Sequence, residues 1–387
     1  MAPNTRTGRA SSEPFRRVPD ADAAHPDALA GGPARGRAAG INPQNRFESL
    51  RLHVLGETLD DAAREHPGGC SVTTRIVPDR TRTILNRVTS PDLGLDWTLN
   101  PYRGCEHGCI YCYARPTHEN LGYSCGLDFE STIVAKHDAP TLLRKELGRP
   151  SWKAEPISMS GVTDAYQPAE QRLGITRGCL EVLAECRQPV GIVTKSALVT
   201  RDIDLLKELA AYRAVQVFIS VTSLDNRLAS RLEPRAAAPQ RRLETIARLA
   251  EAKIPVGVMV APIIPGLTDT ETPAILEAAA DAGATRAGYI LLRLPHQVKD
   301  LFLDWLAREF PQRASHIESL IRQTHDGDLY DANFGVRRRG EGPIAEHIGH
   351  VFRMFSRRFG FNRTPQRLNR DDFRPPRRDP RGQMVMF

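Results

Sequence analysis

The stretch that decides the fold runs from residue 100 to residue 114 and reads Asn100-Pro-Tyr-Arg-Gly-Cys-Glu-His-Gly-Cys-Ile-Tyr-Cys-Tyr-Ala. Its three cysteines, Cys105, Cys109 and Cys112, follow the spacing C-x3-C-x2-C. A cubane iron–sulfur cluster usually takes four thiolates, so a loop with three leaves one iron open to a ligand that is not protein. Gly104 and Gly108 permit the positive-φ backbone that such a tight loop requires. The stretch therefore predicts that the three cysteines bind a [4Fe–4S] cluster.

The same cysteines admit two other arrangements. A structural zinc site takes four nitrogen or sulfur ligands in tetrahedral geometry, and His107, His118 or Cys125 could complete such a set. A disulfide framework is disfavoured because the chain holds seven cysteines, an odd number spread over 387 residues. Residues 1–40 also contain no apolar segment typical of a secretory signal. The spacing alone leaves the zinc arrangement open.

Length and composition are ordinary for a soluble globular protein. The 387 residues suffice for one large or two modest domains, and 41% of them are apolar. No segment approaches the ~20 consecutive apolar residues of a membrane span, so no membrane association is expected. We expect five zones: a disordered N-terminal tail (1–40), a lead-in segment (41–95), a core domain (96–310), a helical C-terminal extension (311–360) and a basic disordered tail (361–387).

Positive charge gathers at the C-terminal end of the sequence. The net charge is +7, and residues 353–387 alone contain ten arginines and three acidic residues. A basic tail can attract phosphate backbones, but such tails also serve solubility alone. Binding of nucleic acid by the tail is therefore one of two interpretations.

Short apolar runs alternate with helical patterns through the core domain. Because the runs are rich in Val and Ile, they are typical of parallel strands buried on both faces. Six β/α alternations indicate an α/β fold, all or part of a (β/α) barrel, with its active site at the carboxyl ends of the strands. The predicted strands are Trp97–Asn100, Pro156–Ser160, Val190–Thr194, Val215–Val221, Val256–Ala261 and Gly288–Leu292. The predicted helices are Thr141–Leu147, Glu170–Cys186, Asp202–Tyr212, Gln240–Ala252 and Thr272–Ala282.

The cysteine loop, with Tyr111 directly before its third cysteine, resembles the radical S-adenosylmethionine (SAM) superfamily. The longer stretch from Asn100 to Arg115 looks like the subgroup related to spore photoproduct lyase. The resemblance covers roughly residues 96–310. It implies a partial (β/α)6 barrel with the cluster loop after the first strand, SAM on the open iron, and reductive cleavage of SAM to a 5′-deoxyadenosyl radical. It also implies that Tyr111 lies against the adenine.

The turn after the second strand matches a place where the superfamily holds the amino group of SAM. After the second strand, Ser160, Gly161, Thr163 and Asp164 are expected to bind the amino group, through oxygen acceptors and a close backbone approach. A plain loop that caps the next helix is the alternative. After the third strand, Lys195 could pair with the SAM carboxylate or with a substrate anion, and a solvated surface lysine is the alternative.

The turns after the fourth and fifth strands provide further candidates for SAM contacts. Ser220 and Thr222 are expected to contact the ribose or the carboxylate of SAM. Ile263 and Ile264, in a turn stiffened by prolines, are expected to pack against adenine, and a tight loop without a ligand is the alternative.

Residues elsewhere in the chain are candidates for the substrate side of the site. Cys125, shortly after the cluster loop, is the candidate catalytic residue, as a hydrogen-atom donor or a redox thiol. Arg231 or Arg235 could hold a carboxylate in a bidentate pair. Further candidates for substrate contact, each with a structural or solvent-exposed alternative, are Arg293, His296, His325, Asp326 and the arginines Arg337 to Arg339.

Two hypotheses of function follow. The first is a radical SAM enzyme, of lyase or transferase type, that abstracts hydrogen from an unidentified substrate, with nucleic acid (DNA repair or RNA modification) as one candidate. Its cofactors would be a [4Fe–4S] cluster and SAM, and its redox partner an electron donor such as flavodoxin or ferredoxin. A cluster of this kind needs a reducing compartment, which indicates the cytoplasm. The second hypothesis is a metal-stabilised nucleic-acid-binding protein without catalysis.

Overall fold

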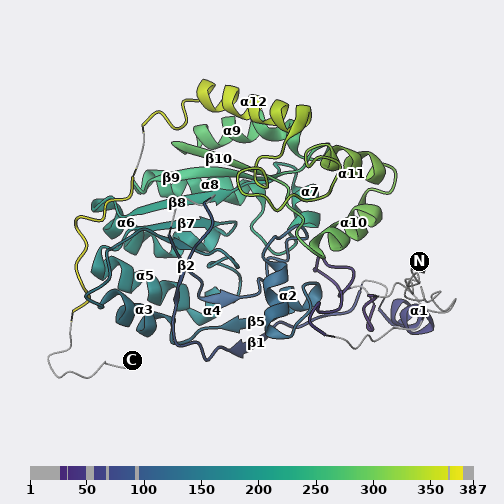
Figure 1. The fold of residues 1–387 in the computed structure, drawn as a ribbon, viewed down its shortest axis with the longest axis horizontal. Coiled ribbons are helices and arrows are strands. Elements are labelled where there is room, and N and C mark those ends of the chain that lie inside the picture. The colour runs from purple at the N-terminus through teal and green to yellow at the C-terminus, as the bar shows by residue number, and fades with distance from the viewer. Residues whose placement is uncertain are drawn as a thin grey trace, which may run out of the picture.

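A curved seven-stranded sheet forms the centre of the molecule in the computed structural model, which describes residues 27–32, 34–48, 56–66, 69–91, 96–364 and 367–377 (Figure 1). The strand order is β10-β9-β8-β7-β6-β3-β2. Six strands run parallel: β3 (Trp97–Leu99), β6 (Ile157–Met159), β7 (Val190–Thr194), β8 (Val215–Ser220), β9 (Val256–Ile263) and β10 (Arg286–Leu291). The edge strand β2 (Leu85–Arg87) pairs antiparallel with β3.

The six parallel strands are the six predicted from the sequence, and each pairs with its neighbour in chain order. Strands β3 and β10 do not pair with each other in the described part of the chain, so the barrel is partial, as expected. Because parallel strands joined by helices point the same way, all six carboxyl ends lie at one end of the sheet. This end, called the mouth below, receives the cysteine loop directly after β3.

The helices between the strands also follow the prediction, with one division. They are α3 (Ala139–Leu147), α4 (Glu170–Leu173), α5 (Ile175–Cys186), α6 (Ile203–Ala211), α8 (Pro239–Glu251) and α9 (Thr272–Asp281). The single helix predicted for residues 170–186 is two helices, because Gly174 has a φ of 63° and turns the chain between them. In Figure 1, α3 and α5 lie below the strands and α9 lies above them.

A second, three-stranded sheet includes the start of the cysteine stretch. Its order is β1 (Arg75–Pro78), β5 (Thr132–Ala135) and β4 (Tyr102–Arg103). Strand β4 belongs to the cysteine stretch itself and pairs with β5 through Tyr102 opposite Ala135. The short helices η1 (Arg115–Leu121) and α2 (Leu127–Ser131) join the loop to β5. The small sheet therefore anchors the start of the loop.

Helices outside the barrel complete the fold. They are α1 (Gly56–Glu65), α7 (Asn226–Leu232), α10 (Val298–Glu309), α11 (Ala314–Arg322) and α12 (Gly342–Arg358), with short turns η2 (Ala197–Asp202) and η3 (Asp269–Glu271). Helix α12 packs on α9 and β10 (Figure 1). The expected helical extension over 311–360 thus consists of α11 and α12. Among the described helices, none combines the length and the apolar character needed to cross a bilayer.

The N-terminal part of the structure differs from the expected disorder over residues 27–40. Ala38, Ala39 and Ile41 are buried in the same apolar cluster as Ile110 of the cysteine loop. The backbone N–H groups of Ala38 and Ala39 donate to Glu130 at 3.2 and 3.0 Å. The carboxylate of Glu130 and the apolar cluster around Ile110 hold this segment in place. The composition of the segment does not reveal either partner. Residues 1–26 lie outside the described ranges.

The expected disordered tail likewise follows the body of the protein over residues 367–377. The N–H of Asn369 donates to the Arg213 carbonyl at 3.0 Å, and the N–H of Arg374 donates to the Cys186 carbonyl at 2.9 Å. Both acceptors are carbonyls at or just beyond the ends of helices, which lack partners inside the helix. Phe373 packs against the main core. Residues 378–387 are not among the described ones.

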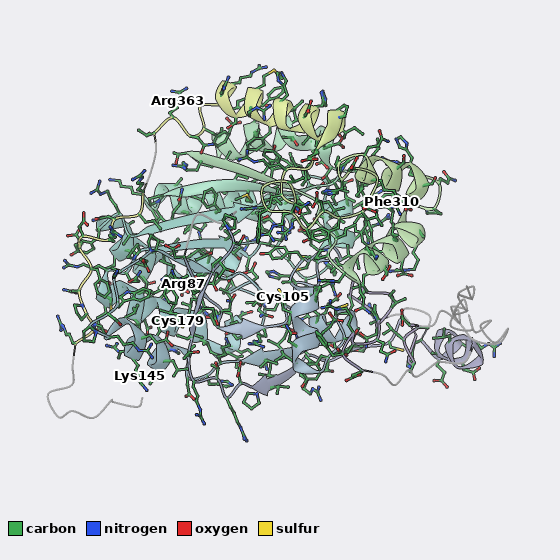
Figure 2. The ribbon with its side chains drawn as sticks, in the orientation of Figure 1. Arg87, Cys105, Lys145, Cys179, Phe310 and Arg363 are labelled. Atoms are coloured by element: carbon green, nitrogen blue, oxygen red, sulfur yellow. The ribbon has the colours of Figure 1, made fainter. Side chains whose placement is uncertain are left out.

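The core lies between the large sheet and its covering helices. Cys179 and Cys186 of α5 are fully buried there. Figure 2 shows Cys179 among the helices at one side of the sheet and Cys105 near the middle of the molecule, beside the mouth. The cysteines of α5 therefore lie in the core, apart from those of the cysteine loop.

Candidate functional site

Three free thiols gather in the cysteine loop at the mouth. Cys105 and Cys109 are buried, Cys112 is half-buried, and none forms a disulfide. Burial raises the pKa of each thiol, and neighbouring Asp164, Cys109 and Cys112 raise that of Cys105 further. Because a metal binds the thiolate, a cation that replaces these protons would relieve an unfavourable arrangement. The three side chains therefore fit a bound cluster.

The backbone of the loop has the conformation that its glycines predicted. Gly104 has a φ of +75° and Gly108 a φ of +67°. A Cβ at Gly104 would lie 2.8 Å from the Thr132 carbonyl oxygen, and one at Gly108 would lie 2.7 Å from Oε2 of Glu130. Both positions therefore require glycine twice over, for conformation and for space.

A buried arginine that the sequence reading did not single out holds the loop from behind. Arg115 is fully buried and donates to the carbonyls of Gly108 (3.1 Å), Cys109 (2.9 Å) and Cys125 (3.1 Å). Its remaining partners are the Gly126 carbonyl at 2.9 Å and Oε1 of Glu130 at 2.6 Å. The sequence shows an arginine directly after the loop, but no local pattern indicates that its side chain reaches back to the carbonyls of the loop.

The turn after β6 lies beside the cysteine loop, as predicted, but its side chains are already engaged. Asp164 accepts from the Lys195 N–H (2.8 Å) and the Thr194 hydroxyl (2.7 Å), and lies 3.3 Å from Nδ1 of His107. Although its burial alone would raise the pKa of Asp164, His107 and these donors lower it. Asp164 is therefore an ionised group that joins β7 to the cysteine loop.

The other members of this turn make similar contacts. Thr163 donates to the Gly104 carbonyl at 2.6 Å, and the Ser160 hydroxyl accepts from the Ala165 N–H at 2.9 Å. The Gly161 N–H donates to Asn100 at 2.7 Å, while its carbonyl accepts from the Tyr113 hydroxyl at 3.0 Å. Ser160 has a φ of +77°, an unusual conformation for a residue with a side chain. The turn is thus bonded to both ends of the cysteine loop.

Lys195, a candidate partner of the SAM carboxylate, is largely buried and not a solvated surface lysine. Its Nζ donates to Ser220 (2.7 Å), Thr222 (3.1 Å) and the Ala261 carbonyl (2.9 Å), and it lies 3.3 Å from Oε1 of Glu233. Ser220 donates to the Ala261 carbonyl at 3.0 Å, and the Thr222 hydroxyl, which donates to Glu233, lies 3.0 Å from the same carbonyl. The candidates from three strand ends therefore come together, as predicted, but they bind one another.

Ile263, Ile264 and Cys125 lie away from the surface of the mouth. The side chains of Ile263 and Ile264 are fully buried in the two main apolar clusters, and their contact with adenine stays a prediction. Cys125 is also fully buried; its thiol lies 3.5 Å from the Gln297 side chain, and burial raises its pKa to about 12. A neutral, covered thiol is a packing group in this state. Their spacing could not reveal this because burial depends on distant segments.

Exposed aromatic rings and arginines lie around the mouth. Tyr113, next to Cys112, is 47% exposed, and the Arg293 guanidinium lies 5.0 Å from its ring centre. Nε of Arg293 is buried and has no hydrogen-bond partner among the described residues. Phe334 is 56% exposed, with the Arg337 guanidinium 4.4 Å from its ring centre. These pairs resemble surfaces on which planar groups stack.

The other candidates for the substrate side separate. Arg235 is 3.3 Å from Glu106 and Arg231 is 3.4 Å from Glu309, so neither is a lone cation. His325 is buried, with Nε2 3.2 Å from the Leu292 carbonyl. His296 and Asp326 have φ values of 53° in loops, and no described contact ties them to the cysteine loop.

The zinc arrangement lacks a fourth ligand. Within the described ranges, no three His, Cys, Asp or Glu side chains converge closely enough to hold one metal ion. His107 pairs with Asp164, His118 packs between Tyr123 and Phe129, and Cys125 faces Gln297. A mononuclear zinc holds all its sulfurs about 2.3 Å from one point, whereas a four-iron cluster spreads its ligands over several irons. In the described part of the chain, His107, His118 and Cys125 therefore do not complete a zinc site with the three cysteines.

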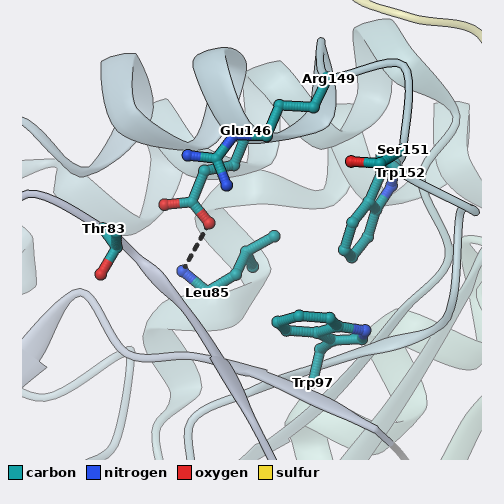
Figure 3. A pocket seen from close by; sticks show the side chains of 7 residues that line it. All are labelled: Thr83, Leu85, Trp97, Glu146, Arg149, Ser151 and Trp152. Atoms are coloured by element: carbon teal, nitrogen blue, oxygen red, sulfur yellow. Dashed lines mark hydrogen bonds between the residues drawn. The ribbon is translucent and has the colours of Figure 1, made fainter.

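A cavity of about 220 Å³ lies at the opposite end of the sheet (Figure 3). It is lined by Thr83, Leu85, Trp97, Glu146, Arg149, Ser151 and Trp152. Glu146 accepts from the N–H groups of Ile84 and Leu85, and the rings of Trp97 and Trp152 meet edge to face at 5.4 Å. Since Trp97 begins β3 and the cysteine loop follows its end, this cavity is separate from the candidate site.

Comparisons with known proteins agree with this geometry. A sequence model of the radical SAM superfamily matches residues 99–279. The uncharacterized protein Rv2578c of Mycobacterium tuberculosis is 38% identical over 245 residues, which cover 62% of this chain and 72% of the relative. The uncharacterized protein MJ0683 of Methanocaldococcus jannaschii is 32% identical over 196 residues, covering 51% and 70%.

A solved structure shares the fold. Spore photoproduct lyase complexed with dinucleoside spore photoproduct superposes with a TM-score of 0.53, over 78% of this chain and 83% of that chain. The sequences are 16% identical, so the match speaks for the fold alone.

Proposed function

Because the chain belongs to the radical SAM superfamily, we propose that it is an enzyme in which Cys105, Cys109 and Cys112 hold a [4Fe–4S] cluster and the mouth binds SAM. When bound, the cluster and SAM supply a 5′-deoxyadenosyl radical that abstracts hydrogen from the substrate. The observation that carries the proposal is the set of three free thiols at the carboxyl end of a six-stranded parallel sheet. Enzymes of this architecture place their chemistry at that end.

The residues of the chain orient the cofactors and exclude water. Arg115 and the glycines hold the loop, and burial of Cys105 and Cys109 keeps solvent from their side of the cluster. We assign SAM to the surface bounded by Tyr111, Lys195 and the turn after β6, with the backbone of Ser160 and Gly161 as its nearest support. Thr163, Asp164, Ser220 and Thr222 act by holding that surface in shape, since their side chains already bond to protein.

We propose a nucleic acid as the substrate class. The support is the exposed Tyr113 and Phe334, each with an arginine beside its ring, because bases stack on such surfaces and phosphates bind guanidinium groups. The structural relative is complexed with a dinucleoside, a ligand of the same chemical kind. The net charge of +7 favours the same partner.

A labelled single-stranded oligonucleotide tests the substrate class. Fluorescence anisotropy should show binding that weakens steeply as salt rises, and Arg293→Met should weaken it at least fivefold. Arg149→Met removes an arginine at the opposite end of the sheet and should leave binding unchanged. Absence of binding at low salt, or equal losses in the two variants, would contradict a nucleic acid at the mouth.

Electrons must reach the cluster from outside the chain. We propose a low-potential protein such as flavodoxin or ferredoxin as the donor, and a reducing compartment, the cytoplasm, as the location. The support is chemical, because a reduced cluster of this type does not persist under oxidising conditions.

Anaerobic reconstitution with iron and sulfide tests the proposed activity. The protein should turn brown and, once reduced, convert SAM to 5′-deoxyadenosine. Cys109→Ala should lose both colour and cleavage, whereas Cys70→Ser, outside the loop, should retain them. A colourless protein that holds one zinc ion, or cleavage that survives in Cys109→Ala, would overturn the proposal.

A further inference from the structure

The segment Leu232–Arg235, directly after α7, lies along the back of the cysteine loop. The Ile110 N–H donates to the Leu232 carbonyl at 3.0 Å, and the Arg235 N–H donates to the His107 carbonyl at 3.3 Å. A Cβ at Gly108 would lie 3.5 Å from Cγ of Pro234. The segment therefore contacts the loop at three successive places, although more than 100 residues separate them in the chain.

Glu233, in the middle of this segment, joins the loop to the cations of the mouth. Its carboxylate is fully buried and accepts from the Tyr111 hydroxyl and from the Thr222 hydroxyl at 2.6 Å. It also pairs with Lys195 at 3.3 Å and with Arg242. Burial alone would raise the pKa of Glu233, but Arg242 and Lys195 hold it well below its usual range. The group is thus a permanent buried anion.

The surrounding charges do not cancel. Two cations face one carboxylate in this set, which leaves one unit of positive charge buried beside the mouth. Arg242 is itself 1% exposed and donates to the Ser220 carbonyl at 3.0 Å, so it is held at the end of β8. Tyr111, whose hydroxyl donates to Glu233, lies between the cluster ligands Cys109 and Cys112 in the loop. Any change at Glu233 is therefore felt at a cluster ligand.

We propose that Glu233 is a positioning residue of the reaction. It holds the hydroxyl of Tyr111, and with it the Cys109–Cys112 turn, against Lys195 and Arg242. Its negative charge also lowers the reduction potential of the cluster. The inference rests on the proposed function, since it concerns the cluster held by that loop. A negative charge near an iron–sulfur cluster makes reduction harder, because the reduced cluster carries one more electron. Glu233 thereby keeps the cluster strongly reducing.

The variant Glu233→Gln tests the charge with little change of shape. In the reconstituted protein, the midpoint potential should shift to more positive values, and the electron paramagnetic resonance signal of the reduced cluster should change. Glu309→Gln is the matched control, because Glu309 pairs with Arg231 at 3.4 Å on the outer side of the same region and does not touch the loop. A potential in Glu233→Gln equal to those of the wild type and the control would overturn the inference.

The contact with Tyr111 is tested separately in protein without a cluster. Tyr111→Phe and Glu233→Gln should be non-additive in the free energy of unfolding, because the first removes the hydrogen bond and the second replaces its charged acceptor by a neutral amide oxygen. Additive losses would contradict the positioning role. If Glu233→Gln does not fold, Glu233→Asp serves: it keeps the charge and shortens the reach, so the potential should stay near the wild-type value while the coupling to Tyr111 is lost. Retained coupling in Glu233→Asp would equally count against the role.

Failure of the proposed function gives a different result. A wild-type protein that binds no cluster would refute the function before any variant is compared. A wild type that binds the cluster and cleaves SAM, beside a Glu233→Gln variant with unchanged potential, would refute only the role of Glu233.

Discussion

At the mouth of the sheet, ionised side chains are buried and paired, whereas at the opposite end two tryptophans pack against each other beside a cavity. Glu233, Asp164 and Arg115 all lie in the first region and contact the cysteine loop or its neighbours. Trp97 and Trp152 of the second region use their indole N–H groups on Glu155 and Gln188. Burying charge is costly unless every partner is in place. The buried charges of the mouth therefore fix the geometry of the site at a cost in stability, whereas the opposite end stabilises the protein through packing.

The largest test of this contrast removes the buried arginine behind the loop. Arg115→Met leaves Glu130 charged and unpaired, which should cost about 3–5 kcal/mol of the free energy of unfolding and prevent loading of iron. Arg144→Met breaks a pair with Glu185 whose side chains are 37% and 25% exposed, and should cost less than about 1 kcal/mol. Urea unfolding compares the two, and similar losses would remove the distinction between a buried and an exposed pair.

Acid should act on the region beside the loop through His118. Burial lowers its folded pKa to about 4 from an unfolded value of 6.5. Between these values the unfolded chain binds the proton more readily, so stability falls as pH drops through this window, by up to about 3 kcal/mol. The slope should flatten in His118→Gln. It should persist in His316→Gln, at an exposed position; equal slopes in wild type and His118→Gln would contradict the assignment.

Gly108 and Gly122 allow the cost of a left-handed backbone to be measured separately from the cost of a steric clash. Gly108 and Gly122 have φ values of +67° and +80°, but a Cβ at Gly108 meets Glu130 whereas one at Gly122 meets nothing within 4 Å. Gly122→Ala should cost roughly 1–2 kcal/mol for the left-handed backbone alone. Gly108→Ala should cost about 2 kcal/mol more, from overpacking, and should reduce bound iron. Equal unfolding free energies for the two variants would show that the loop shifts to avoid the contact with Glu130, and would contradict the predicted overpacking.

The smallest effect is expected at the opposite end. Trp152→Phe removes the hydrogen bond of 2.8 Å to Gln188 and should cost about 1 kcal/mol of stability. Production of 5′-deoxyadenosine by the folded variant should equal that of the wild type. A loss of cleavage without a loss of folded protein would show that the two ends of the sheet are coupled.

The sequence could be interpreted correctly wherever a feature is local. The six strands were predictable because each is a short run rich in β-branched residues, and Val190–Thr194 is recovered to the residue. The division at Gly174 was missed because apolar spacing continues through it, and β4 because two residues make no pattern. The candidates for SAM contact stand out in the sequence one by one, but their partners do not, since Lys195 follows β7 and pairs with Glu233, which follows β8 and α7.

The sequence by itself determined the class of fold and the loop that carries the chemistry, because strand runs and cysteine spacing act over a few residues. Only the tertiary structure decided how charge is arranged around that loop. Arg115 turning back on Glu130, residues 38 and 39 docking on the same carboxylate, and Glu233 bridging Tyr111 to Lys195 all join segments distant in the chain. Electrostatic and burial energies depend on the full set of neighbours, which local spacing does not encode. The three-cysteine loop could be predicted from a short stretch of sequence, whereas the charged and buried residues around it could not.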